Sequence, residues 1–111
     1  MTPDQRYQKF TLSRQEPLRL SLALEGFFQD GDEIRREAYG QYLRRRLQPA
    51  VNALIEDDDT AGLAALADWF TAGETDRFIA LARERKKAAA LVWLLRYKGE
   101  RFGYVDRDFS L

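Results

Sequence analysis

Two stretches in the second half of the chain decide the fold: AGLAALADWFT at residues 61–71 and AAALVWLLRYK at residues 88–98. In both, apolar residues recur at spacings of three and four, as they do on one face of an α-helix. These residues are Leu63, Leu66, Ala67 and Phe70 in the first stretch, and Leu91, Leu94 and Leu95 in the second. Alanine and leucine also have high intrinsic helix propensity. We therefore predict two helices that must bury these faces against other helices.

Boundary signals surround both stretches. Residues 57–60, Asp-Asp-Asp-Thr, form a polar loop that ends in a helix cap. Gly73 suits the position just after a helix, and Gly99 suits the end of the helix over 88–98. Between them, Thr75 is the expected cap of a helix over 76–86, with Asp76 at its positive end. That helix would turn three residues inward: Phe78, Ile79 and Ala82.

A shift of 28 positions aligns residues 51–69 with residues 79–97, and similar residue types fall at matching positions. The matched pairs are Val51 with Ile79, Leu54 with Ala82, Glu56 with Glu84, Ala61 with Ala89, Leu63 with Leu91, Leu66 with Leu94, Ala67 with Leu95 and Trp69 with Tyr97. Both copies read as helix, tight polar turn, helix. We expect two stacked helical hairpins over residues 49–99.

The second copy resembles a known repeat. Its residues Phe78-Ile79-Ala80-Leu81-Ala82, Ala90-Leu91, Leu94-Leu95 and Gly99 resemble the helix–turn–helix part of an ankyrin repeat. The Leu94-Leu95-Arg96-Tyr97-Lys98 segment is also similar to the end of the last helical repeat of uncharacterised proteins from Clostridia-type bacteria. The chain departs from ankyrin at the Thr-Pro-Leu-His opening, which is Arg77-Phe78-Ile79-Ala80 here, and at the turn glycine, which is Lys86. The resemblance implies stacked hairpins, an interaction role and no catalytic residues.

The first half gives mixed signals. Residues 1–14 begin like a capped helix, with Thr2, Pro3 and Gln5 in the favoured positions, but Phe10 and Leu12 alternate as in an extended segment. Residues 17–28 contain four alternating leucines, yet their composition and one apolar face favour helix. A turn at residues 30–32 then leads into a helix capped by Asp32.

That helix begins a long apolar stripe, which Pro49 interrupts because proline lacks an N–H donor and clashes with the preceding turn. The helix must therefore kink, or end and start again. The stripe is formed by Tyr39, Leu43, Leu47, Ala50 and Leu54.

Composition excludes several classes of function. The 111 residues include 18 basic and 18 acidic residues, so the basic excess typical of nucleic-acid-binding proteins is missing. Cysteine and histidine are both absent, which removes disulfides, the common zinc sites and the usual general base. The N-terminal residues do not show the basic and apolar pattern of a signal peptide, and no segment has membrane-spanning length, so we expect a cytoplasmic protein that is not an enzyme and has no cofactor.

Two surfaces are candidates for interaction. The first comprises Tyr42 and the basic run Arg44, Arg45 and Arg46, which either binds an acidic or phosphate-bearing partner or is a solvated helix end. The second comprises Trp93 and Tyr97, four residues apart on one helix face. Either Phe102, Tyr104 and Phe109 of the tail cover this pair, or another chain does. Residues 56–59 are a weaker candidate for a divalent cation, since the EF-hand spacing is missing.

The sequence therefore predicts an all-α domain of stacked antiparallel helical hairpins. Its parts are a divergent helical segment at 1–48, two hairpin repeats at 49–99 and a capping tail at 100–111. The expected function is a non-enzymatic protein–protein interaction module, as a monomer or homodimer. The alternative is a small nucleic-acid-binding regulator that uses the helix carrying Arg44–Arg46.

Overall fold

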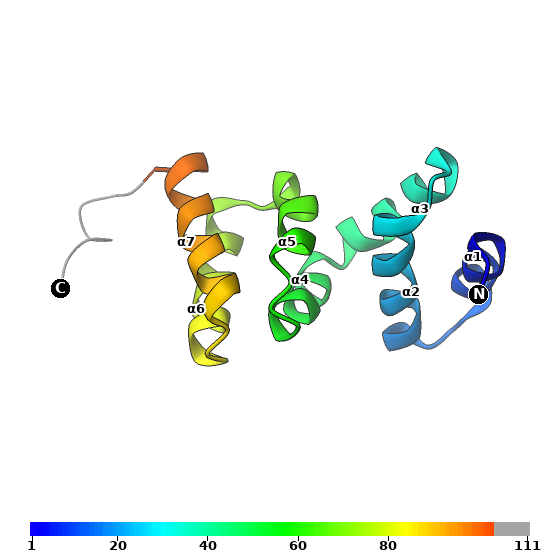
Figure 1. Cartoon of the computed structure of the whole chain (residues 1–111), viewed down its shortest axis with the longest axis horizontal. Coiled ribbons are helices and arrows are strands. Elements are labelled where there is room, and N and C mark those ends of the chain that lie inside the picture. The colour runs from blue at the N-terminus through cyan, green and yellow to red at the C-terminus, as the bar shows by residue number, and fades with distance from the viewer. Residues whose placement is uncertain (104–111) are drawn as a thin grey trace. The chain divides into compact units, whose positions relative to one another are not determined.

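The computed structural model describes residues 1–103. Within them the backbone forms seven α-helices and one short 3₁₀ helix, and no β-strand (Figure 1). The prediction of an all-α fold is confirmed. Contacts divide the chain into two units, unit 1 at residues 1–50 and unit 2 from residue 51 onward, with the boundary inside helix α4. None of the helices in residues 1–103 combines the length and apolar composition needed to cross a membrane.

Unit 1 begins with α1 (Pro3–Leu12), which excludes the extended alternative for this segment. The Thr2 hydroxyl accepts a hydrogen bond from the Gln5 N–H at 3.1 Å, and the Gln5 side chain accepts one from the Thr2 N–H at 2.9 Å. This reciprocal capping box satisfies two N–H groups that a helix start leaves open. Phe10 is buried while Leu12 is 80% exposed, so the alternation of the two does not reflect a shared face.

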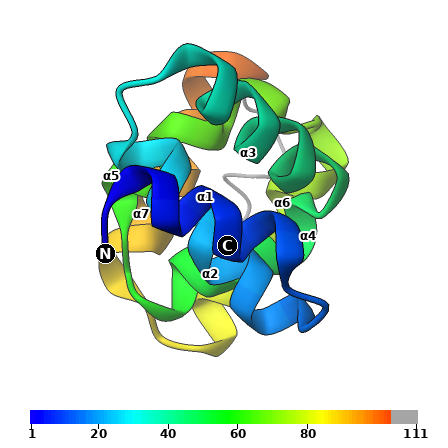
Figure 2. The same ribbon diagram turned by 90° about the vertical axis from the view of Figure 1, so that its right-hand side faces the viewer.

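Helix α2 (Glu16–Gln29) confirms the helical reading of residues 17–28. Pro17 stands at its second position, where the missing N–H costs nothing. Helices α1 and α3 both contact α2, and Figure 2 shows the three from the side of the N-terminus. Gly26 of α2 lies directly beneath the ring of Tyr39. The close approach of α2 and α3 therefore depends on a missing side chain.

Helix α3 (Glu33–Arg45) starts at the predicted cap, since the Asp32 carboxylate accepts a hydrogen bond from the Arg35 N–H at 2.9 Å. The Arg35 side chain joins the turn before α3 to α1. It donates to the buried Asp30 carboxylate at 2.7 and 3.1 Å and to Asp4 at 2.7 Å. The Arg35 hydrogen bonds lower the pKa of Asp30, so this buried group stays ionised.

The stripe predicted from Tyr39 to Leu54 is buried throughout. It is divided between two helices, because α3 ends at Arg45 and α4 (Leu47–Glu56) begins two residues later. Arg46 breaks the helical geometry with φ −123° and ψ 42°. Pro49 is then the third residue of α4, within the first turn, where N–H groups have no partner inside the helix. Pro49 therefore breaks no hydrogen bond within the helix.

Unit 2 corrects the prediction of a helix over 61–71. Helix α5 (Thr60–Leu66) is followed by the 3₁₀ helix η1 (Ala67–Trp69), and Phe70 is extended. Helix α6 (Ala72–Glu84) starts at Thr71, whose hydroxyl accepts from the Glu74 N–H at 3.1 Å while the Glu74 carboxylate accepts from the Thr71 N–H at 3.0 Å. This capping box ends the preceding helical segment before Thr71.

Three further predictions from unit 2 are wrong. Gly73 lies inside the first turn of α6, and Thr75 is a buried residue whose hydroxyl donates to the Thr71 carbonyl at 2.8 Å. Helix α7 (Ala88–Arg101) continues through Gly99 and ends next to Gly103, which has φ +75°. A residue in this left-handed conformation is the usual helix terminator, and glycine adopts it at little cost.

The apolar core of unit 2 follows the predicted faces. Leu63, Leu66 and Leu94 are fully buried, and α6 contributes the predicted residues Phe78, Ile79 and Ala82. Leu91 and Leu95 are only partly buried. Helix α7 contacts both α6 and α5.

The turn after α4 and the turn after α6 have the same backbone pattern. Asp58 and Lys86, 28 residues apart, have φ +52° and +58°. The Asp59 N–H donates to the Leu54 carbonyl at 2.9 Å, and the Lys87 N–H donates to the Ala82 carbonyl at 2.9 Å. Both bonds run from the residue after the left-handed position to the helix end, as in a Schellman turn.

Candidate functional site

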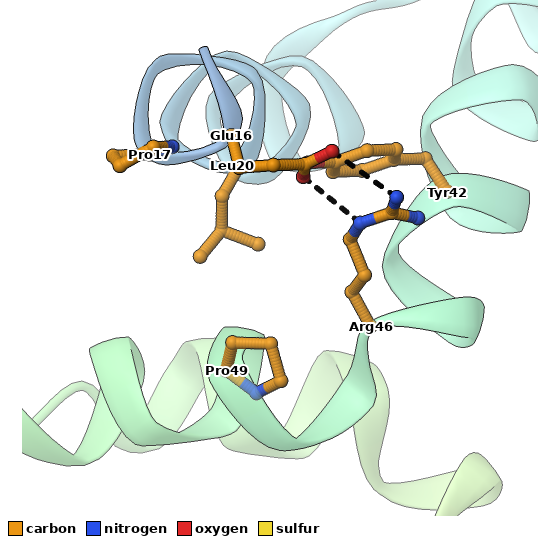
Figure 3. A pocket seen from close by; sticks show the side chains of 6 residues that line it. All are labelled: Glu16, Pro17, Leu20, Tyr42, Arg46 and Pro49. Carbon is orange, nitrogen blue, oxygen red and sulfur yellow. Dashed lines mark hydrogen bonds and ion pairs between the residues drawn. The ribbon is translucent and has the colours of Figure 1, made fainter.

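Unit 1 carries a hollow of about 490 Å³ between the start of α2, the end of α3 and the start of α4. Figure 3 shows Leu20 of α2 pointing toward Pro49 of α4, with Glu16 and Arg46 along one side. A volume of this order is typical of sites that bind a small group or a side chain. We define the hollow by its lining residues: Glu16, Pro17, Leu20, Tyr42, Arg46 and Pro49.

One side of the hollow is a hydrogen-bonded network around Glu16. The Tyr42 hydroxyl donates to Glu16 Oε2 at 2.6 Å, and Arg46 donates to the same carboxylate at 2.9 and 3.1 Å. These residues come from both sides of the α2–α3 turn, so the network joins the start of one helix to the end of the next. Two donors on one carboxylate hold the side chains in a fixed arrangement.

The Tyr42 ring is also contacted by two cations. The guanidinium carbons of Arg19 and Arg46 lie 4.7 and 4.6 Å from its centroid, within the range of cation–π attraction. Phe10 of α1 packs edge-on against the same ring at 5.2 Å between centroids. Tyr42 is therefore 7% exposed, and the surfaces that a guest would meet are the aliphatic ones of Pro17, Leu20 and Pro49.

The network shifts the pKa values of Glu16 and Tyr42 in opposite directions. The Tyr42 hydrogen bond, followed by Arg46, lowers the pKa of Glu16, so this carboxylate stays charged at neutral pH. Burial, followed by the Glu16 hydrogen bond, raises the pKa of Tyr42 to about 12. Tyr42 is therefore a neutral hydrogen-bond donor at neutral pH.

We expect Tyr42 to titrate late in base, together with Tyr39, whose pKa is also raised by burial. With a pKa of 10.0 in the unfolded chain and about 12 in the fold, Tyr42 contributes stability below pH 10 that is lost as pH rises toward 12. Tyr42→Phe should remove a late step from the phenolate absorbance curve and flatten the fall in unfolding free energy over this interval. Loss of an ordinary step near pH 10 instead would contradict the network.

The predicted basic surface is divided. Arg44 and Arg45 are exposed, and neither has a partner among residues 1–103, whereas the charge of Arg46 is offset by Glu16. Tyr42, predicted as a surface residue, is buried and contributes only to the wall of the hollow. The four residues therefore do not form one continuous exposed face.

Trp93 and Tyr97 of α7 stack on one another, with centroids 5.2 Å apart and an interplanar angle of 8°. Tyr97 is held internally, since its hydroxyl donates to the Ala67 carbonyl at 2.6 Å and its ring meets Phe70 at 5.7 Å. Phe102 of the tail also contacts Tyr97, at 5.9 Å, while Tyr104 and Phe109 lie outside the described residues.

Trp93 borders a second, more open hollow of about 440 Å³. Val92 beside it is 58% exposed. The lining residues come from α5 and α7: Thr60, Ala88, Ala89, Val92, Trp93 and Arg96.

The acidic run at residues 56–59 has structural roles. Asp59 caps α5 through the Gly62 N–H at 2.9 Å, and Glu56 forms an ion pair with Arg85 at 3.3 Å. The Asp58 carboxylate accepts a hydrogen bond from the Ala90 N–H at 2.7 Å, at the start of α7. In the described part of the chain, no three acidic side chains gather as a metal site requires.

Sequence reasoning missed four lining residues of the unit 1 hollow: Glu16, Pro17, Leu20 and Pro49. Pro17 and Pro49 are signals for helix starts, and the hollow opens beside these two helix starts. Nothing local in the sequence shows that the two starts face one another. Comparisons with protein-family models, with curated proteins and with solved structures give no match to this chain.

Proposed function

We propose that the chain is a non-enzymatic protein–protein interaction module that receives a side chain of its partner in the unit 1 hollow. The observation that carries this proposal is an aliphatic recess beside a fixed polar network. Such a combination supplies affinity through the apolar walls and orientation through a few polar groups. The unit 1 hollow is also more enclosed than the hollow beside Trp93.

The helical architecture supports the same function. Hairpin modules present side chains from rigid helices, and the resemblance to ankyrin-like hairpins implies an interaction role. The alternative, nucleic-acid binding through Arg44–Arg46, is weakened because Arg46 is already paired with Glu16, so the three arginines do not form one run of free charge. Binding along a phosphate backbone draws on several free cations at once.

The test uses two matched variants of the full chain. Pro17 and Ile34 are both exposed apolar residues at the second position of a helix, where glutamate is favourable. Pro17→Glu removes one wall of the hollow and places a charge at its mouth. Ile34→Glu makes a comparable change away from the lining residues.

We expect crosslinking in the native cell extract to recover a partner with the wild-type chain and with Ile34→Glu. Pro17→Glu should lower its recovery by about tenfold, the effect of losing one well-buried aliphatic contact. Circular dichroism must show equal helix content in the three proteins. A partner recovered equally by Pro17→Glu would remove the hollow from the function.

A further inference from the structure

We infer that the partner of the unit 1 hollow is an acidic peptide segment that inserts an aliphatic side chain and presents carboxylates to the surrounding arginines. This inference rests on the proposed function and specifies the chemistry of the partner. It is argued from the charges around the hollow, from the helix ends that open into it and from the character of its walls.

Two arginines, Arg19 and Arg46, lie beside the single carboxylate of the hollow. Glu16 is the one acidic lining residue, and it faces Arg46 at 2.9 Å and Arg19 at 4.0 Å. Unit 1 has nine basic and seven acidic residues. An approaching carboxylate therefore meets more positive than negative charge.

Two helix starts strengthen this field. Glu16 and Pro17 are the first two residues of α2, and the side chain of its N-cap residue, Gln15, makes no capping hydrogen bond. Pro49 lies in the first turn of α4. Helix N-termini carry partial positive charge from unpaired N–H groups, which favours anions nearby. The field supports the charge count but does not define a site by itself.

The two exposed arginines at the end of α3, Arg44 and Arg45, point to different sides of the helix. Successive residues of an α-helix are about 100° apart, which places Arg45 about 60° from Tyr42 and Arg44 about 160° from it around α3. Arg45 therefore flanks the side of α3 that lines the hollow, and Arg44 faces away. Both are exposed, and both lie in the last turn of α3. They form a matched pair in which only position distinguishes the two charges.

The walls favour an aliphatic guest over an aromatic one. Arg19 and Arg46 already lie over the Tyr42 ring, so the ring is poorly placed to stack on a second ring. The remaining apolar surface comes from two prolines and a leucine. A leucine-like side chain flanked by aspartate or glutamate satisfies both the walls and the charge.

Fluorescence anisotropy with labelled synthetic peptides tests this inference on the full chain at about 150 mM salt. The probe is acetyl-Glu-Asp-Leu-Leu-Asp-Glu-amide. One comparison peptide replaces both leucines with serine, and another replaces the four acids with lysine. We expect the acidic leucine peptide to bind about tenfold more tightly than either.

The variants locate the binding. Arg45→Glu should weaken the acidic leucine peptide about fivefold and Arg44→Glu less than twofold, with equal helix content. Equal effects of the two reversals, no effect of Pro17→Glu on the peptide, or equal binding of the serine or lysine peptide would overturn the inference. So would absence of binding, or tighter binding of a DNA or RNA oligonucleotide of matched length.

The two proposals fail separately. If the crosslinked partner is lost from Pro17→Glu while the acidic leucine peptide does not bind, the hollow keeps its function and the acidic chemistry is rejected. If neither the partner nor the peptide responds to Pro17→Glu, the hollow itself is rejected.

Discussion

Gly26→Ala is expected to lower the free energy of unfolding by about 3 kcal/mol, although alanine is the better helix former. A Cβ at this position would lie 2.2–2.6 Å from three atoms of the Tyr39 ring. Tyr39 is fully buried and cannot swing aside, because Phe10 and Tyr7 pack against its ring at 4.9 and 5.7 Å. The substitution must therefore separate α2 from α3 or displace α1.

Gly73→Ala is the matched control. Gly73 is also helical, but a Cβ there meets nothing within 4 Å. Propensity alone then acts, and we expect the free energy of unfolding to rise by about 0.5–1 kcal/mol. Urea denaturation followed by far-UV circular dichroism measures both variants. A neutral or stabilising Gly26→Ala would show that Tyr39 does not hold α2 at this distance.

Tryptophan fluorescence gives a second measurement, which shows in which unit a substitution acts. Trp69 and Trp93, the only two tryptophans of the chain, both lie in unit 2. Tryptophan fluorescence therefore follows unit 2, whereas circular dichroism reports both units. A larger change in circular dichroism than in fluorescence for Gly26→Ala would place the damage in unit 1.

The helix starts at Thr2 and Asp32 could be read from the sequence because capping depends on residues within one turn. The boundary at residues 71–75 was misread for a related reason. Thr71 and Thr75 both suit a cap, and the Glu74 that completes the capping box of Thr71 decides between them. The end of α7 is ambiguous in the same way. Gly99 and Gly103 both suit a helix end, and only the backbone conformation shows that Gly103 terminates α7.

The hollow was beyond prediction because it depends on packing between helices. Its lining residues span positions 16–49, and the two ends meet only when Glu16 bonds to Tyr42 and Arg46. Arg46 was predicted as part of a basic run, with its charge available to a partner. Its tertiary partner, 30 positions away, changes that interpretation.

Asp58→Ala is expected to lower the free energy of unfolding by about 2 kcal/mol, through two local effects. The Asp58 carboxylate caps α7 by accepting the Ala90 N–H, which removes an unpaired donor at the helix start. Asp58 also holds φ +52°, a conformation that aspartate tolerates better than alanine. Asp57→Ala is the control, because Asp57 is exposed and its side chain forms no hydrogen bond or ion pair within residues 1–103.

Asp58→Gly separates the two effects. Glycine accepts φ +52° without strain, so only the cap is lost, and we expect a cost of about 1 kcal/mol. Urea denaturation followed by tryptophan fluorescence, to which Trp93 of α7 and Trp69 both contribute, measures the series. An Asp58→Gly variant as stable as the wild type would show that the bond to Ala90 contributes nothing.

The 28-residue correspondence provides a rescue. Asp59 caps α5 by accepting the Gly62 N–H, and the positions 28 residues later are Lys87 and Ala90. Asp59 and Lys87 have nearly the same backbone, φ −91° and −92° with ψ 88° in both. Lys87 makes no side-chain cap, and Asp58 takes that role. Lys87→Asp should therefore restore the cap in the Asp58→Gly background, recovering about 1 kcal/mol, and add little in the wild type. Equal gains in both backgrounds would mean that Asp58 and position 87 do not serve the same N–H group.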